Sequence, residues 1–155
     1  MFDRIRSIAN SACLRTTVIT GFPGETEDDF DELFNCVEEI QFDHLGVFNY
    51  SDSEDLASHS LGDHVPEDIA MQRHDAIMSR QMELSAGNNE KYLDQTLSVL
   101  IEEAPEKGVY IGRTAFQAPE VDGITYVHKE RLTVGEFADV RISDTLEYDL
   151  TGEAL

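Results

Sequence analysis

The segment 17–26 constrains the fold of this chain most, because it joins an apolar strand to a helix through a turn with two glycines. Its sequence is Thr-Val-Ile-Thr-Gly-Phe-Pro-Gly-Glu-Thr. Gly21 and Gly24 can adopt backbone angles that other residues avoid, and the proline between them fixes its own φ. Thr26 and Asp29 match the capping box of a helix N-terminus. A strand that ends in this way can bring bare backbone close to a ligand, although an ordinary turn between strand and helix has the same pattern.

A strand–helix–strand unit surrounds this turn. Residues 14–20 and 42–50 have the composition of strands, and five apolar residues between them share one helical face: Phe30, Leu33, Phe34, Val37 and Ile40. Cys36 lies within this helix and is expected to be a small core residue. Two parallel strands joined by a helix form a right-handed βαβ unit. Because two strands leave both sheet edges open, we expect this unit to be the end of a larger α/β domain.

The second half of the chain changes in character. A helix is predicted from Pro66 to about Tyr92, because proline suits its first position and acidic residues follow. From Thr96 onward, turn residues separate five short strands, which are predicted at residues 97–102, 109–113, 124–127, 137–142 and 150–154. This pattern predicts a small antiparallel barrel. The fold class is therefore α/β over residues 1–93, followed by an all-β five-stranded barrel over residues 94–155.

Charge excludes some partners and favours others. The chain has 32 acidic and 11 basic residues, a formal net charge of −21, and no Lys or Arg between Arg15 and Arg73. Such a field repels phosphate backbones and attracts a basic protein partner. General surface acidity, as in proteins of a saline cytoplasm, explains the same composition. The chain has no apolar run long enough to span a bilayer and no signal peptide at its start, so a cytoplasmic location without membrane contact is predicted.

Metal binding is not predicted from this sequence. Cys13 and Cys36 form no C-x-x-C motif, and the five histidines are scattered without the spacing of metal ligands. No residue has the pattern of a catalytic nucleophile or acid. We therefore predict neither a metal site nor a catalytic residue within these 155 residues.

Several strings of residues resemble one enzyme family. The glycine turn, together with Leu14–Thr17 and Leu45–Ser51, resembles the last part of the radical-SAM methylthiotransferases. Three later strings resemble the TRAM domain of the RimO-type branch, whose members methylthiolate an aspartate of a small-subunit ribosomal protein: Ile111-Gly112-Arg113, Ala118-Pro119-Glu120-Val121-Asp122-Gly123 and Glu147-Tyr148-Asp149-Leu150. This resemblance implies that residues 1–93 are the C-terminal βα units of a partial TIM-like barrel and residues 94–155 a TRAM domain.

The resemblance also implies a cofactor site. Full-length members use S-adenosylmethionine (SAM) and two 4Fe–4S clusters, and the cysteines that bind those clusters are absent from this chain, which alone is expected to be inactive. By the resemblance, the adenosine side of the SAM pocket is lined by residues of the glycine turn and of the two strands: Ile19, Gly21, Phe22, Pro23, Gly24, Glu25, Phe48 and Asn49. Thr17 stands where the wider superfamily has glycine, and Glu25 lies one residue late, as in the other methylthiotransferases. The loop after the second strand lacks the Gly-Thr usual in the family.

The TRAM-like region suggests a protein partner. Residues 96–155 contain 12 acidic and five basic side chains, so a basic ribosomal protein suits this surface better than tRNA. The candidate docking residues are Arg113, Glu120, Asp122, Asp144, Glu147 and Asp149. Two other interpretations stay open: the tRNA-modifying branch of the family, whose TRAM domain binds RNA, and a non-catalytic acidic adaptor.

Overall fold

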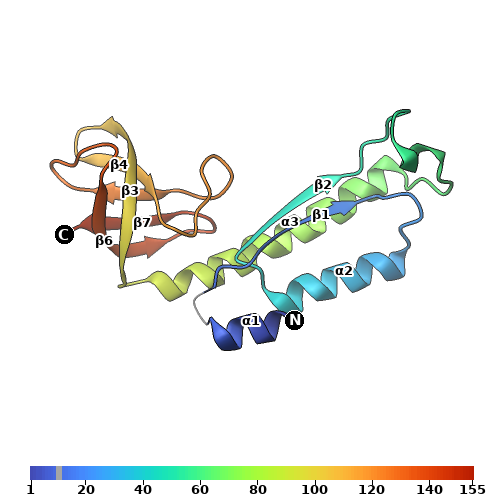
Figure 1. Cartoon of the computed structure of the whole chain (residues 1–155), viewed down its shortest axis with the longest axis horizontal. Coiled ribbons are helices and arrows are strands. Elements are labelled where there is room, and N and C mark those ends of the chain that lie inside the picture. The colour runs from blue at the N-terminus through green and yellow to red at the C-terminus, as the bar shows by residue number, and fades with distance from the viewer. Residues whose placement is uncertain (10–11) are drawn as a thin grey trace. The chain divides into compact units, whose positions relative to one another are not determined.

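The computed structural model describes residues 1–9 and 12–155, which divide into two compact units, Met1–Leu84 and Ser85–Leu155 (Figure 1). The first unit contains α1 (Phe2–Ile8), β1 (Arg15–Thr20), α2 (Glu27–Ile40), β2 (His44–Asn49), η1 (Ala57–Ser60) and most of α3 (Glu67–Asn89). The second contains the end of α3, η2 (Glu90–Tyr92), β3 (Thr96–Glu106), β4 (Val109–Arg113), β5 (Thr125–His128), β6 (Phe137–Thr145) and β7 (Leu150–Ala154).

The two strands of the first unit form a parallel sheet, as the sequence predicts. β1 pairs with β2 in register from Arg15 opposite His44 to Thr20 opposite Asn49. Within the described residues neither strand has a second partner, so both outer edges of this sheet are open. Open edges on both sides are unusual for a stable domain and agree with the expectation that further strands belong beside these two.

Helices α2 and α3 cover one face of this sheet. Val37 from α2, Val47 from β2 and Ile77 from α3 are buried at the centre of the resulting core. The predicted helices are confirmed, since α2 begins after the capping Thr26 and α3 continues without a break to Asn89. Cys36 is exposed, so the prediction that it is a core residue is wrong. It lies on the solvent side of α2, one residue before the buried Val37.

The second unit is a closed five-stranded barrel with the strand order β3-β4-β5-β7-β6, which confirms the predicted fold class. Four neighbouring pairs are antiparallel, but β5 and β7 are parallel, so the prediction of a fully antiparallel barrel is wrong. Strand direction must alternate around a fully antiparallel ring, and an odd number of strands cannot alternate all the way round. A closed ring of five strands therefore requires at least one parallel pair.

Branched apolar side chains fill the barrel. Val99, Val127, Val140, Ile142 and Leu150 are fully buried, and each lies on the inward-facing positions of its strand. Burying a Val, Leu or Ile side chain contributes about 1.5–3 kcal/mol each, so this cluster is a substantial core for a small unit. Among the residues that the structure describes, no helix is both long and apolar enough to cross a membrane.

Candidate functional site

The turn at the end of β1 has a fixed backbone shape. The Glu25 amide donates to the Phe22 carbonyl at 2.9 Å, which closes the turn. Gly21 and Gly24 have φ angles of +78° and +87°, where a side chain would be strained. A Cβ atom built on Gly21 would lie 2.5 Å from the Cβ of Ala70, so α3 packs directly against the end of the strand. Glycine is required at position 21 both for its backbone angle and for this close approach.

The two glycine amides are not bare. The Gly21 amide donates to the Glu25 carboxylate at 3.0 Å, and the Gly24 amide donates to the Asp63 carbonyl at 2.9 Å. The expectation that this turn offers unpaired backbone to a ligand therefore does not hold for these two groups. The turn is instead shaped from within, by a side chain of its own and by the loop that follows β2.

Glu25 connects the turn to α3. Its carboxylate accepts from the Arg73 guanidinium at 2.5 Å as well as from Gly21, and its side chain is only 10% exposed. Arg73, 6% exposed, also donates to the exposed carboxylate of Glu27 at 2.6 Å. Burial lowers the pKa of Arg73, but hydrogen bonds to Glu27 and Glu25 outweigh burial, so the pKa is raised above its ordinary value. The guanidinium is therefore a permanent positive charge behind the turn.

Three predicted cofactor residues are apolar and lie exposed around the C-terminal end of the sheet. Ile19 and Phe48 are direct partners across the two strands and are 52% and 63% exposed, on the face that the helices leave uncovered. Phe22 follows in the turn, is 44% exposed, and contacts the ring of Tyr50 edge-on with centroids 5.3 Å apart. An exposed apolar face of this kind is unusual in a finished domain.

The remaining predicted cofactor residues stabilise this arrangement. Pro23 is buried beneath the turn. Asn49 is exposed at the end of β2, and its side-chain oxygen accepts from the hydroxyl of the fully buried Thr20 at 3.0 Å. Strand β1 is thus tied to β2 by a side-chain hydrogen bond at the point where the turn begins.

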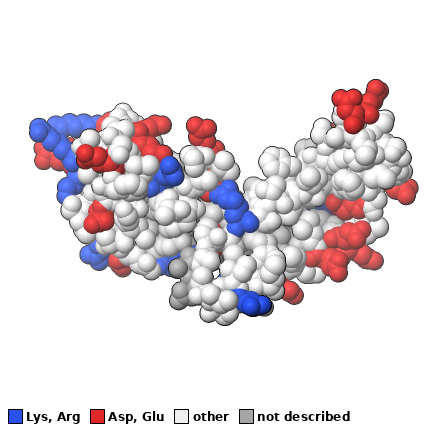
Figure 2. Space-filling model, viewed as in Figure 1, with Lys and Arg blue, Asp and Glu red and all other residues white. Residues whose placement is uncertain are grey.

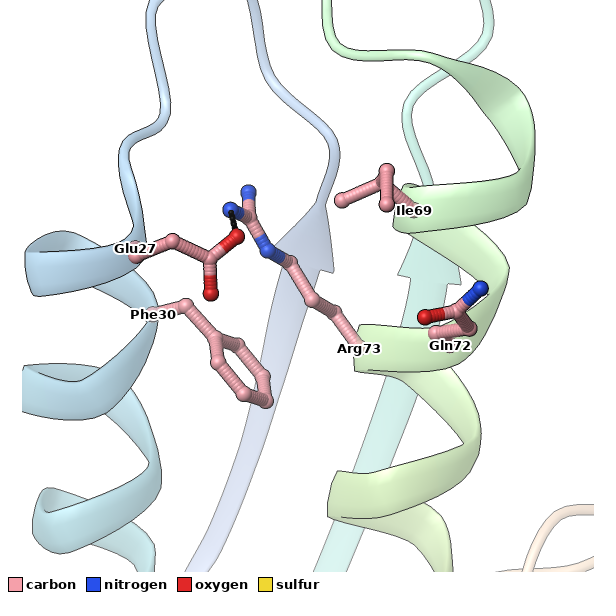
Figure 3. A pocket seen from close by; sticks show the side chains of 5 residues that line it. All are labelled: Glu27, Phe30, Ile69, Gln72 and Arg73. Carbon is pink, nitrogen blue, oxygen red and sulfur yellow. Dashed lines mark hydrogen bonds and ion pairs between the residues drawn. The ribbon is translucent and has the colours of Figure 1, made fainter.

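A small hollow lies on the other side of this unit, between α2 and α3 (Figure 3). Glu27, Phe30, Ile69, Gln72 and Arg73 line it, with the guanidinium 5.5 Å from the centre of the Phe30 ring. Its volume of about 140 Å³ is well below the roughly 300 Å³ of the smallest ordinary ligand pockets. The hollow is therefore too small for a nucleoside-sized cofactor. Its two charged groups, Glu27 and Arg73, also pair with each other already.

The loop after β2 folds back on itself through polar contacts. The Tyr50 hydroxyl lies 2.9 Å from the Ser58 hydroxyl, and the Asp52 carboxylate lies 2.9 Å from Nδ1 of His59. The hydrogen bond from His59 holds the pKa of Asp52 below its usual value. These contacts keep the loop beside the aromatic rings at the end of the sheet, where His64 also lies 6.5 Å from the Tyr50 ring.

In the barrel, two of the predicted docking acids have structural partners. The Asp122 carboxylate accepts from the Ala118 amide at 2.6 Å, and the Asp149 carboxylate accepts from the Ile124 amide at 2.8 Å. Their side chains are half-buried and bound to backbone amides, whereas a docking side chain would be expected to point freely outward. The backbone of Gly123 also approaches the Tyr148 carbonyl so closely that a Cβ would clash. Residues 118–124 and 146–149 therefore form one connected surface.

The other candidates for docking are more available. Glu120 and Glu147 are exposed on that connected surface, and Asp144 is exposed at the end of β6, where it accepts from the Thr145 amide at 2.9 Å. Arg113 is the exception, because it is half-buried and pairs with Glu102 at 2.7 Å. Acidic side chains are also dense in the first turn of α2, and Figure 2 shows several on the visible face of that unit.

Arg73 is the residue that sequence reasoning missed. It is the first basic residue after Arg15. A single positive charge that follows so many acidic residues is expected to pair with some of them, and this is the available signal. Which acids it contacts could not be read from spacing, because Glu25 lies 48 positions earlier in the chain. In the described ranges, 1–9 and 12–155, no group of three or more His, Cys, Asp or Glu side chains could hold a metal ion.

Comparison with known proteins finds one matching domain model and several similar proteins. Residues 95–155 match the TRAM domain model. The chain is 49% identical over 152 residues to ribosomal protein uS12 methylthiotransferase RimO of Clostridioides difficile (strain 630), which covers 97% of this chain and 34% of that protein. Proteins of the same name from Clostridium novyi (strain NT) and Microcystis aeruginosa (strain NIES-843 / IAM M-2473) are 47% and 45% identical over 96% and 99% of this chain.

The matched region is only part of each relative. The chain spans about a third of the length of these proteins, 34% or 35% in the three cases. The predicted domain boundary after residue 93 lies between the division of the two compact units after Leu84 and the start of the TRAM match at residue 95.

Proposed function

This chain is a homologue of the RimO-type methylthiotransferases over nearly its whole length, and we propose that it forms the part of such an enzyme that completes the SAM-binding domain and carries the TRAM domain. The proposed reaction inserts a methylthio group at an aspartate of ribosomal protein uS12, in the cytoplasm. SAM and two 4Fe–4S clusters supply the radical and the sulfur when bound to the complete enzyme. No residue of this chain is assigned to cluster binding or to the chemical step.

The uncovered sheet face is the observation that carries the cofactor proposal. Ile19, Phe48 and Phe22 offer apolar contacts at the carboxyl ends of two parallel strands, which is where α/β barrels bind their ligands. The residues present therefore suit the adenosine part of SAM. Their role is to bind and orient it, through apolar contact from β1 and β2 and through the fixed shape of the Gly21–Glu25 turn.

A chimera tests this proposal, in which this chain replaces the matching third of the Clostridioides difficile relative. Replacing Ile19 or Phe48 with Ala removes apolar contact that we expect to contribute about 1.5 kcal/mol, so SAM affinity should fall about tenfold. Met71→Ala is the matched control, because Met71 is 50% exposed on α3. Calorimetric titration with SAM measures the effect, and unchanged affinity in both sheet variants would contradict the cofactor proposal.

The TRAM barrel is proposed to dock the substrate protein. Ribosomal proteins are basic, and the connected surface of residues 118–124 and 146–149 presents the exposed carboxylates of Glu120 and Glu147. Asp144 lies at the end of β6 and extends the acidic surface. Asp122 and Asp149 contribute negative potential there. Their carboxylates also have structural roles, since Asp122 closes its own loop through the Ala118 amide and Asp149 joins the two loops through the Ile124 amide.

A further inference from the structure

The buried ion pairs of Arg73 have a consequence for the glycine turn. Arg73 lies on α3, outside the turn and on the opposite side of the sheet from the uncovered face with Ile19 and Phe48. It cannot contact a ligand on that face. Its effect on the site must pass through the residues that it holds.

A continuous chain of contacts leads from Arg73 to the turn. The guanidinium binds the Glu25 carboxylate at 2.5 Å, and it lies 3.3 Å from the Glu25 carbonyl. The second oxygen of that carboxylate accepts from the Gly21 amide at 3.0 Å. Gly21, with a φ of +78°, is the first residue after the end of β1 at Thr20. Both oxygens of Glu25 are thus engaged, one by α3 and one by the backbone of the turn.

The same part of α3 touches the turn a second time. Ala70 is one helical turn before Arg73, and its Cβ lies where a side chain on Gly21 would be. The other end of the guanidinium binds Glu27 in the first turn of α2. Arg73 therefore fixes the turn relative to the helices on either side of it. A buried carboxylate without this cation would be costly, because removing one partner of a buried pair leaves an uncompensated charge.

We propose that Arg73 is a positioning residue for the cofactor turn: through Glu25 it sets the orientation of the Gly21 peptide and so the shape of the surface that carries Phe22. This proposal rests on the proposed function for its link to SAM, but its structural claim does not. A lysine is not equivalent at position 73, because one ammonium cannot bind two carboxylates in the planar geometry of a guanidinium.

Hydrogen exchange of the Gly21 amide tests the structural claim in this chain without any ligand. We expect Arg73→Ala to accelerate that exchange about tenfold, because the acceptor on Glu25 loses its anchor. Arg80→Ala is the matched control, since Arg80 also lies on α3 and pairs with Glu38 and Glu83 but does not touch the turn. In this control the Gly21 rate should stay within about twofold of wild type.

Chemical rescue separates positioning from a general loss of stability. Adding methylguanidinium to Arg73→Ala should restore most of the Gly21 protection, because the cation can occupy the space between Glu25 and Glu27. Potassium chloride at the same ionic strength should not. Equal exchange in wild type and Arg73→Ala, or equal acceleration in Arg80→Ala, would overturn the proposal, and so would the absence of rescue.

The link to SAM is measured in the chimera. If Arg73 positions the cofactor turn, Arg73→Ala should weaken SAM binding about tenfold, while Arg80→Ala leaves it unchanged. A wild-type chimera that binds no SAM would contradict the proposed function, and the exchange measurement would still decide the role of Arg73. If the Arg73→Ala chimera binds SAM normally, Arg73 does not position the cofactor site, whatever its effect on the exchange of the Gly21 amide.

Discussion

At the scale of single residues, the two glycines of the turn make different demands on the fold. Gly21 combines a positive φ with a close approach to Ala70, whereas a Cβ on Gly24 would meet nothing within 4 Å. Gly21→Ala should therefore lower the free energy of unfolding of the first unit by about 3 kcal/mol, and Gly24→Ala by about 1 kcal/mol. Urea titration followed by NMR signals of that unit measures both values. Equal effects would show that the contact with α3 has little energetic weight.

The capping box of α2 gives a prediction with a pH dependence. Hydrogen bonds from Thr26 hold the pKa of Asp29 below its ordinary value of 3.8. A lowered pKa in the folded state stabilises the protein above pH 3.8, and this contribution is lost as the pH falls through the folded value. In Thr26→Ala the pKa of Asp29 should rise toward 3.8, which an NMR titration of its carboxyl group detects. An unchanged pKa would mean that the capping box is not formed.

Thr26→Ala also removes the cap itself. At neutral pH this change should lower the free energy of unfolding by about 1 kcal/mol, since the amide of Asp29 loses its acceptor. Thr26→Ser, which keeps the hydroxyl, is the matched control and should stay close to wild type in the same urea titration.

At the scale of elements, Gln117 connects the loop after β4 to the barrel wall. It is buried, and its side-chain oxygen accepts from the Thr114 amide at 2.9 Å and from the Thr125 hydroxyl at 2.8 Å. Gln117→Leu would leave both donors buried without an acceptor and should lower the free energy of unfolding of the barrel by about 2–4 kcal/mol. Gln95→Leu, at an exposed position, should change it by less than about 0.5 kcal/mol. Similar losses in the two variants would contradict this role.

Most elements could be predicted from the sequence because they depend on local signals. The capping residues, the apolar stripe of α2 and the turn residues between the barrel strands all lie within a few positions of the structure that they specify. The partners of Arg73 and Asp149 could not be predicted in this way, because Glu25 and Ile124 lie 48 and 25 positions away along the chain. Their contacts depend on where α3 and the two barrel loops arrive in space, and spacing along the chain carries no signal for that.

The parallel pairing of β5 with β7 could be predicted only in part. No strand signal marks it, but the count of five strands in a closed ring already requires one parallel pair. The exposure of Cys36 has a different cause. Residues 36 and 37 are neighbours on a helix and point in directions about 100° apart, so only one of them can face the core.

At the scale of the whole molecule, charge should dominate the encounter with a basic protein. We expect Glu120 and Glu147 to meet basic side chains of the partner in a desolvated contact. The double variant Glu120→Gln/Glu147→Gln should then bind ribosomal protein uS12 more weakly by about 1–3 kcal/mol. The matched control is Glu103→Gln with Glu106→Gln, which removes the same charge from an exposed segment of β3. Binding of wild type should also weaken as salt shortens the Debye length below about 10 Å. An affinity that changes neither with salt nor with the Glu120/Glu147 substitutions would contradict the docking proposal.

The central claim is that this chain serves a methylthiotransferase that acts on a ribosomal protein, and the product of the chimera tests it most directly. The chimera, with its clusters reconstituted, is incubated with SAM, a reductant, a sulfur source, purified uS12 and bulk tRNA. Mass spectrometry of both substrates then shows where the methylthio group is added. The account predicts the added mass on an aspartate of uS12 and none on tRNA. Modification of tRNA, or of neither substrate while the unaltered relative modifies uS12, would contradict it.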